Sequence, residues 1–123
     1  MTRIAVVNDD TVFLEMMAVV LREQEYDVKI YREANNAFEQ LRRELPDLII
    51  LDIRMETPES GWNLLELLTL DRDIHRVPLI VCSAAVRDLQ SHQEWLNSHG
   101  IQVLPKPFDI DELYACVERS LRP

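Results

Sequence analysis

Five short runs rich in Ile, Val and Leu recur along the chain, and longer segments separate them. The runs occupy residues 4–7, 28–31, 48–51, 79–82 and 101–104. Three of them are apolar throughout, which is typical of strands that are covered on both faces of a parallel sheet. The pattern therefore predicts five strands, three of which are covered on both faces.

The segments between these runs carry apolar residues at helical spacing. In the last segment, Leu113, Val117 and Leu121 fall on one stripe. Asp109 precedes Glu112 by three residues, which is close to a capping box at the start of a helix. The predicted helices span residues 11–23, 35–45, 62–70, 86–98 and 109–121. Five repeats of strand and helix predict an α/β sandwich, with helices on both faces of a parallel sheet.

Length and charge restrict the class of protein. With 123 residues, we expect one domain over residues 1–123. Lys and Arg total 13 against 22 Asp and Glu, so the net charge is -9, and we expect this domain not to bind nucleic acid. The apolar runs are too short to cross a membrane and no signal peptide is visible, so we expect a cytoplasmic protein without membrane contact.

Glycine and cysteine usage excludes two further kinds of site. The chain has only two glycines, Gly61 and Gly100, which excludes a glycine-rich phosphate-binding loop. The two cysteines, Cys82 and Cys116, form no CxxC pair and lie in apolar segments. We interpret both cysteines as small buried residues.

Polar side chains follow four of the five predicted strands. They are Asn8, Asp9 and Asp10 after the first, Asp52 after the third, Ser83 after the fourth and Lys106 after the fifth. Ligands of open parallel sheets bind beyond the carboxyl ends of the strands, where these groups converge if the four strands are neighbours. Carboxylates without His or Cys favour a hard ion such as Mg²⁺. Together with a hydroxyl and an ammonium group, they suit phosphoryl transfer onto a carboxylate.

Each of these residues also has a structural interpretation of its own. Asp9 and Asp10 can cap the helix that begins near residue 11. Asp52 can end its strand in a turn, Ser83 can cap a helix, and Lys106 can be a solvated charge. The whole set in this order favours a functional site instead.

The ordered motifs resemble those of one known family. They are Val-Val-Asn-Asp-Asp at 6–10, Leu-Asp-Ile-Arg-Met at 51–55, Gly61, Ser-Ala at 83–84 and Lys-Pro-Phe-Asp at 106–109. Over essentially its whole length, the chain resembles the receiver domain of bacterial two-component response regulators. The resemblance implies a flavodoxin-like (βα)5 fold in three layers, with strand order 2-1-3-4-5.

The resemblance also implies a role for each motif residue. Asp52 is the expected phosphoacceptor, and Asp9, Asp52 and the backbone carbonyl of Arg54 are the expected Mg²⁺ ligands. Ser83 is the expected switch hydroxyl. Lys106 is expected to pair with the phosphoryl group, next to a cis bond to Pro107. The domain would then be an enzyme only in phosphorylating and dephosphorylating itself.

The partners that this implies are a sensor histidine kinase or a phosphotransfer protein as the donor. The output partner, or an output domain beyond residue 123, is not identified by the sequence, and a homodimer is a further option. Trp95 lies about 120° around its predicted helix from Leu89 at ~100° per residue. It is therefore either a partner contact or packed back against its own helix.

Three positions depart from the family's usual pattern. Asn8 replaces the first acid of a pair, so we expect Asn8 and Asp10 to act in the outer shell of the metal. Glu56 stands where proline is common, in a loop (56–60) that is expected to border the site. Val103 replaces a common aromatic residue, and valine makes no large rotamer change. Either the output signal then depends on backbone and loop movement alone, or the protein switches weakly. Val103 is also a candidate for a partner surface.

Two other kinds of function remain as alternatives. The departures favour a degenerate receiver that acts as a phosphorylation-independent interaction module, whereas Asp9, Asp52, Ser83 and Lys106 oppose it. A phosphatase or a flavin-binding relative is less well supported. Arg54 cannot protonate a leaving group, and no phosphate-binding loop follows the first strand.

Overall fold

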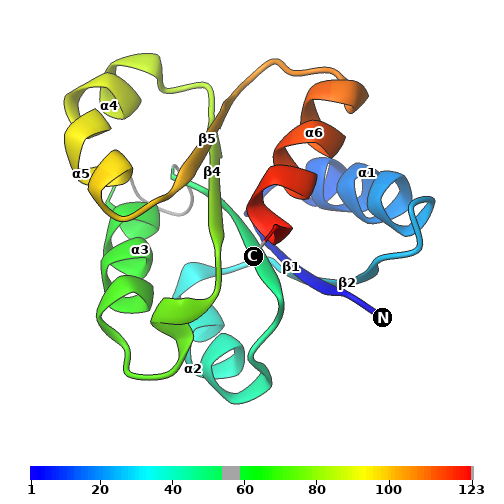
Figure 1. Cartoon of the computed structure of the whole chain (residues 1–123), viewed down its shortest axis with the longest axis horizontal. Coiled ribbons are helices and arrows are strands. Elements are labelled where there is room, and N and C mark those ends of the chain that lie inside the picture. The colour runs from blue at the N-terminus through cyan, green and yellow to red at the C-terminus, as the bar shows by residue number, and fades with distance from the viewer. Residues whose placement is uncertain (54–58, 123) are drawn as a thin grey trace.

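The computed structural model describes residues 1–53 and 59–122. Its five strands form one parallel sheet in the order β2-β1-β3-β4-β5 (Figure 1). The strands are β1 (Arg3–Val7), β2 (Asp27–Tyr31), β3 (Leu48–Asp52), β4 (Leu79–Ser83) and β5 (Gln102–Pro105). Every residue of β3 and β4 is buried, as expected for apolar strands covered on both faces. The predicted strand order is confirmed.

Helices cover both faces of this sheet (Figure 1). One face carries α1 (Thr11–Arg22) and α6 (Ile110–Leu121). The other carries α2 (Ala34–Glu44), α3 (Ser60–Leu70), α4 (Val86–Ser91), α5 (Gln93–Ser98) and the short 3₁₀ helix η1 (Ile74–Arg76). Side chains of β3 alternate between the two resulting cores, with Ile50 in one and Ile49 in the other. The three-layer arrangement is as expected.

The segment 86–98, predicted as one helix, is divided into α4 and α5 at His92. The backbone N–H of His92 donates to Leu89 O at 3.3 Å. In a continuous α-helix it would donate to Asp88 O, four residues back. The Asp88 carbonyl contacts the His92 ring Nδ1 at 2.9 Å and accepts from the Ser91 hydroxyl at 3.1 Å instead. Side chains thus bind the Asp88 carbonyl oxygen in place of the backbone N–H that would continue the helix.

Helix ends follow the local sequence signals. Asp109 and Glu112 form the capping box at the start of α6, because each side chain accepts from the other residue's backbone N–H. α2 ends at Leu45, whose φ of 46° is left-handed, and Pro46 follows. These caps fix where α2 and α6 begin or end relative to the sheet.

Both cysteines are buried in the core that α1 and α6 cover. Burial raises the pKa of the Cys82 thiol to about 12 and also raises the pKa of Cys116. Neither thiol is therefore poised for reaction. Among the residues that the structure describes, no helix has the length and apolar character needed to cross a membrane.

Candidate functional site

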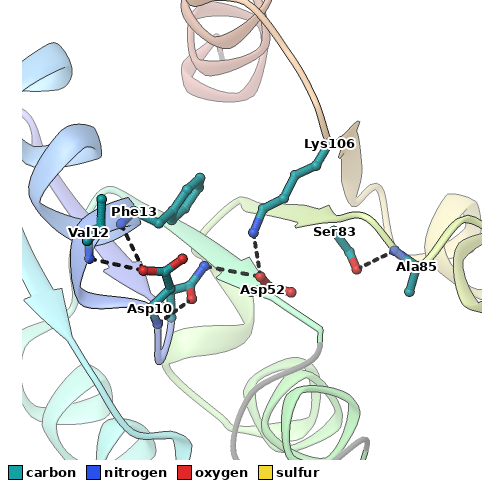
Figure 2. Close-up of polar contacts among 8 residues, drawn as sticks. Asp10, Val12, Phe13, Asp52, Ser83, Ala85 and Lys106 are labelled. Carbon is teal, nitrogen blue, oxygen red and sulfur yellow. Dashed lines mark hydrogen bonds and ion pairs between the residues drawn. The ribbon is translucent and has the colours of Figure 1, made fainter.

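The Asp52 side chain lies at the carboxyl end of β3 and is only 7% exposed. Two donors, one beyond the end of β1 and one beyond the end of β5, meet its Oδ2 atom (Figure 2). Lys106 Nζ donates at 2.7 Å and Asn8 Nδ2 donates at 3.1 Å. An ionised carboxylate only accepts hydrogen bonds, so these donors satisfy an otherwise costly buried charge.

The Lys106 ammonium is held on an aromatic surface as well as by Asp52. Its Nζ lies 4.1 Å from the centroid of the Phe13 ring, within the range of a cation–π contact. Phe13 in turn meets Phe108 edge to face, with centroids 6.3 Å apart. The backbone N–H of Lys106 donates to Ser83 O at 3.0 Å, and the Lys106–Pro107 bond is cis, as expected. These contacts aim the ammonium at Asp52.

Asn8 connects Asp52 to the start of α1. It is 1% exposed, and its Oδ1 accepts from the backbone N–H of Asp10 at 2.9 Å while its Nδ2 binds Asp52. The Asp10 carboxylate accepts from the N–H groups of Val12 at 3.0 Å and Phe13 at 3.3 Å. Asp10 is therefore the N-cap of α1, the structural role that the sequence left open.

The remaining acid of this segment, Asp9, is exposed and adjoins Asn8. Within residues 1–53 and 59–122, no group of three or more His, Cys, Asp or Glu could hold a metal ion. Asp9 and Asp52 each contribute a carboxylate at this end of the sheet. Mg²⁺ is commonly bound through one or two carboxylates while it keeps several waters, so this donor set fits a largely hydrated Mg²⁺ ion.

Ser83 ends β4 at the same edge of the sheet and is 1% exposed. Its hydroxyl oxygen accepts from the backbone N–H of Ala85 at 3.0 Å (Figure 2). The hydroxyl therefore supports the turn that leads into α4 in this conformation. A change in its partner would act directly on the start of that helix.

Gly61 lies against the chain just beyond Asp52. A Cβ atom at this position would lie 1.9 Å from the carbonyl oxygen of Ile53 and 2.5 Å from its Cα. Only glycine permits so close an approach of α3 to the backbone next to Asp52. Gly61 thus has a packing role that its place in the motif did not reveal.

The structure brings Asn8, Asp52 and Lys106 into direct contact and places Ser83 at the same edge. The expected roles of Arg54 and Glu56 lie outside the described residues. Elsewhere, Trp95 and Val103 are partly buried against the core on the α2–α5 face. Trp95 therefore packs on the core and still presents part of its surface.

The sequence did not predict a role in the site for Phe13 or for Phe108. Phe13 lies three residues after the cap residue Asp10, and Phe108 belongs to the Lys-Pro-Phe-Asp motif at 106–109. The contact of Phe13 with the Lys106 ammonium, and its ring contact with Phe108, join segments far apart in the chain. Spacing within either segment carries no signal of that contact.

The fold and this arrangement define a class of signalling domain. The family model for the response regulator receiver domain matches residues 4–118, and the chain belongs to this family. Receiver domains are not classical enzymes, and they interact with histidine kinases and output domains.

Two relatives with similar sequences are longer than this chain. The transcriptional regulatory protein ZraR of Escherichia coli K12 is 30% identical over 96% of this chain and 26% of its own length. The DNA-binding response regulator MtrA of Mycolicibacterium paratuberculosis is 31% identical over 98% of this chain and 51% of its own length. The chain thus spans between a quarter and about half of the length of these two relatives.

Solved structures show the same fold. The receiver domain of the sensor histidine kinase PA1611 from Pseudomonas aeruginosa PAO1 is 26% identical, with a TM-score of 0.83 over 98% of this chain and 97% of that one. It is described with a magnesium ion coordinated in its active site cleft. The Vibrio cholerae chemotaxis response regulator CheY4 has a TM-score of 0.85 at 20% identity, over 98% of this chain and 99% of that one. The second likeness supports the fold alone.

Proposed function

We propose that this domain accepts a phosphoryl group on Asp52 and changes conformation in response. The observation that carries the proposal is the buried Asp52 carboxylate at the end of β3, with the Lys106 ammonium 2.7 Å from its Oδ2. The donor is a phosphohistidine of a sensor histidine kinase or of a phosphotransfer protein. The domain acts on itself in the cytoplasm.

In the proposed reaction, a carboxylate oxygen of Asp52 attacks phosphorus, and the phosphorus–nitrogen bond of the donor breaks. The nitrogen keeps the electron pair of that bond and takes a proton, which leaves a neutral imidazole and an aspartyl phosphate. Lys106 keeps its proton and stabilises the negative charge on the phosphoryl oxygens. The aromatic contact with Phe13 holds the ammonium in place for this role.

Asp9 and Asp52 would hold a Mg²⁺ ion, with the backbone carbonyl of Arg54 as the third protein ligand that the family resemblance implies. When bound, the ion supplies positive charge that offsets the phosphoryl oxygens. Asn8 orients Asp52 through its amide hydrogen bond and lies next to Asp9, where it can hold a metal-bound water. Asp10 adds negative charge nearby while it caps α1.

Switching is proposed to begin at Ser83. Its hydroxyl would leave the Ala85 N–H and bind the phosphoryl group on Asp52, which alters the start of α4 only three residues further on. Val103 lacks the ring that could report this change by rotating. The signal would therefore travel through the chain that joins β4 to α4.

The donor protein is proposed to dock on α1. Val12, Met16 and Val19 recur at helical spacing on this helix and are 75%, 40% and 59% exposed. The stripe starts two residues after Asp10, the cap that binds Asn8 in the site. A phosphohistidine that reaches Asp52 must bring its own protein against the surface beside the site, and an exposed apolar stripe there suits such a contact.

Incubation with phosphoramidate and Mg²⁺ tests the proposal, because its phosphorus–nitrogen bond resembles that of phosphohistidine. We expect one added phosphoryl group on the wild-type chain and none on Asp52→Asn. A folded wild-type chain that gains nothing would favour a phosphorylation-independent interaction module instead.

A further inference from the structure

A hollow lies between α3 and the α4–α5 pair. Its volume is about 290 Å³, and its lining residues are Trp62, Glu66, Ser91, His92, Glu94 and Trp95. Both tryptophans of the protein line it. We call it the tryptophan pocket.

Contacts with histidine rings hold both tryptophans of the tryptophan pocket in place. Trp62 of α3 stacks on His92, with centroids 3.8 Å apart and an angle of 24° between the rings. Trp95 packs on His99, with centroids 4.3 Å apart and an angle of 36°. Both tryptophans also pack against the core and are only partly buried. Each indole is therefore held in position while part of it borders the pocket, as a preformed binding surface requires.

The pocket is negatively charged. Glu66 and Glu94 are exposed carboxylates at its edge, and neither has an ion pair or a side-chain hydrogen bond within the described residues. No Lys or Arg belongs to the lining. Carboxylates beside aromatic rings disfavour an anionic ligand and favour a cation that can also contact a π face.

We propose that the tryptophan pocket binds an arginine side chain presented by a partner protein. A guanidinium group is planar, stacks on indole rings and donates forked hydrogen bonds to carboxylates, which matches the two kinds of group found here. A lysine ammonium can satisfy the charge but lacks the flat face and the fork. The net charge of -9 would also attract a basic protein surface over some distance. This inference does not depend on phosphorylation at Asp52.

The test uses the two indole N–H signals in a ¹H–¹⁵N NMR spectrum, which Trp62→Phe and Trp95→Phe assign. The probe is the peptide acetyl-Gly-Arg-Gly-Arg-Gly-amide. Matched peptides carry lysine, leucine or citrulline, the neutral isostere of arginine, in place of arginine. We expect both indole signals to shift and saturate with the arginine peptide, more weakly with the lysine peptide, and not with the citrulline or leucine peptide.

The double variant Glu66→Gln/Glu94→Gln should weaken binding of the arginine peptide about tenfold, since two exposed charge pairs are lost. Glu23→Gln/Glu39→Gln is the control, because it removes two exposed carboxylates elsewhere and gives the same net charge. The control should bind like the wild type, and both variants should keep the wild-type melting temperature. No saturable shift, an equal response to citrulline or leucine, or an equal loss in the control would each overturn the proposal.

Discussion

The amide nitrogen of Asn8 donates a hydrogen bond to the Asp52 carboxylate over 3.1 Å. An acid at position 8 could not donate in its ionised form and would repel Asp52. Asn8 therefore stabilises the buried Asp52 without a metal ion, and it also supplies one negative charge fewer for binding Mg²⁺. These two effects oppose each other.

We expect Asn8→Asp to lower the stability of the metal-free domain by about 1–2 kcal/mol, because a hydrogen bond becomes a repulsion. The same change should increase the stabilisation that Mg²⁺ gives, since more negative charge surrounds the ion. Thermal unfolding in EDTA and over a MgCl₂ titration measures both effects. Asn8→Ala is the control that loses the hydrogen bond without adding charge. An Asn8→Asp variant with the wild-type Mg²⁺ response would contradict this account.

Lys106→Met should remove a charged donor from the buried Asp52 carboxylate while the hydrogen bond from Asn8 remains. We expect the free energy of unfolding to fall by about 1–3 kcal/mol, the usual cost of removing a partner from a buried charge. Phosphorylation by phosphoramidate should become undetectable or very slow, because the phosphoryl oxygens lose their ammonium partner. Lys29→Met is the matched control, since Lys29 is the only other lysine and pairs with Glu44 instead. Equal phosphorylation rates for the two variants would exclude the proposed role of Lys106.

Gly61→Ala should destabilise the protein by about 1–3 kcal/mol, the usual cost of forcing extra volume into a packed site. The added Cβ would lie 1.9 Å from Ile53 O, so α3 or the backbone next to Asp52 must move. We therefore expect slower phosphorylation as well as a lower melting temperature. Gly100→Ala serves for comparison. Its φ of 66° makes alanine unfavourable, but an added Cβ would meet nothing within 4 Å. It should lower stability and leave phosphorylation unchanged.

The apolar stripe on α1 can be tested by adding a charge. We expect Val19→Glu to slow phosphoryl transfer from a phosphorylated donor protein at least several-fold, because docking is weakened. Transfer from phosphoramidate should not change, since a small donor needs no docking surface. Leu70→Glu provides a control at another exposed apolar residue, which is 81% exposed on α3. If Val19→Glu slowed both donors equally, the stripe would not be a docking surface.

Glu44 gives a prediction about pH. Hydrogen bonds from Lys29, and then from Tyr31, lower the pKa of Glu44 below its usual value. A lowered pKa means that the contribution to stability is present above the unfolded pKa of about 4.3 and is lost as the pH falls through the folded value. Because the pair is largely exposed, Glu44→Gln should cost less than about 1 kcal/mol at pH 7. Urea unfolding should show this difference at pH 7 and none at pH 2.5, and an equal difference at both would refute the assignment.

The fold was largely predictable because burial is continuous along the two central strands β3 and β4. The apolar runs at 48–51 and 79–82 became strands covered on both faces, and Asp109 with Glu112 became the capping box. The division at His92 was not predictable from apolar spacing. It depends on side chains of Ser91 and His92 that take the Asp88 carbonyl from the backbone.

The site was predictable in composition but not in its contacts. Motif order placed Asn8, Asp52, Ser83 and Lys106 at one edge, which the structure reproduces. The cation–π contact of Lys106 with Phe13 joins distant segments, and the close approach of Gly61 to Ile53 depends on how α3 packs. Neither contact leaves a local pattern in the sequence.

The central claim is that Asp52 accepts a phosphoryl group, and intact-mass spectrometry tests it most directly. Wild-type protein and Asp52→Asn would each be incubated with phosphoramidate, with MgCl₂ or with EDTA. We predict a gain of one phosphoryl group for the wild type with Mg²⁺ only. A folded wild-type protein that gains no mass, or an equal gain in Asp52→Asn, would contradict the claim.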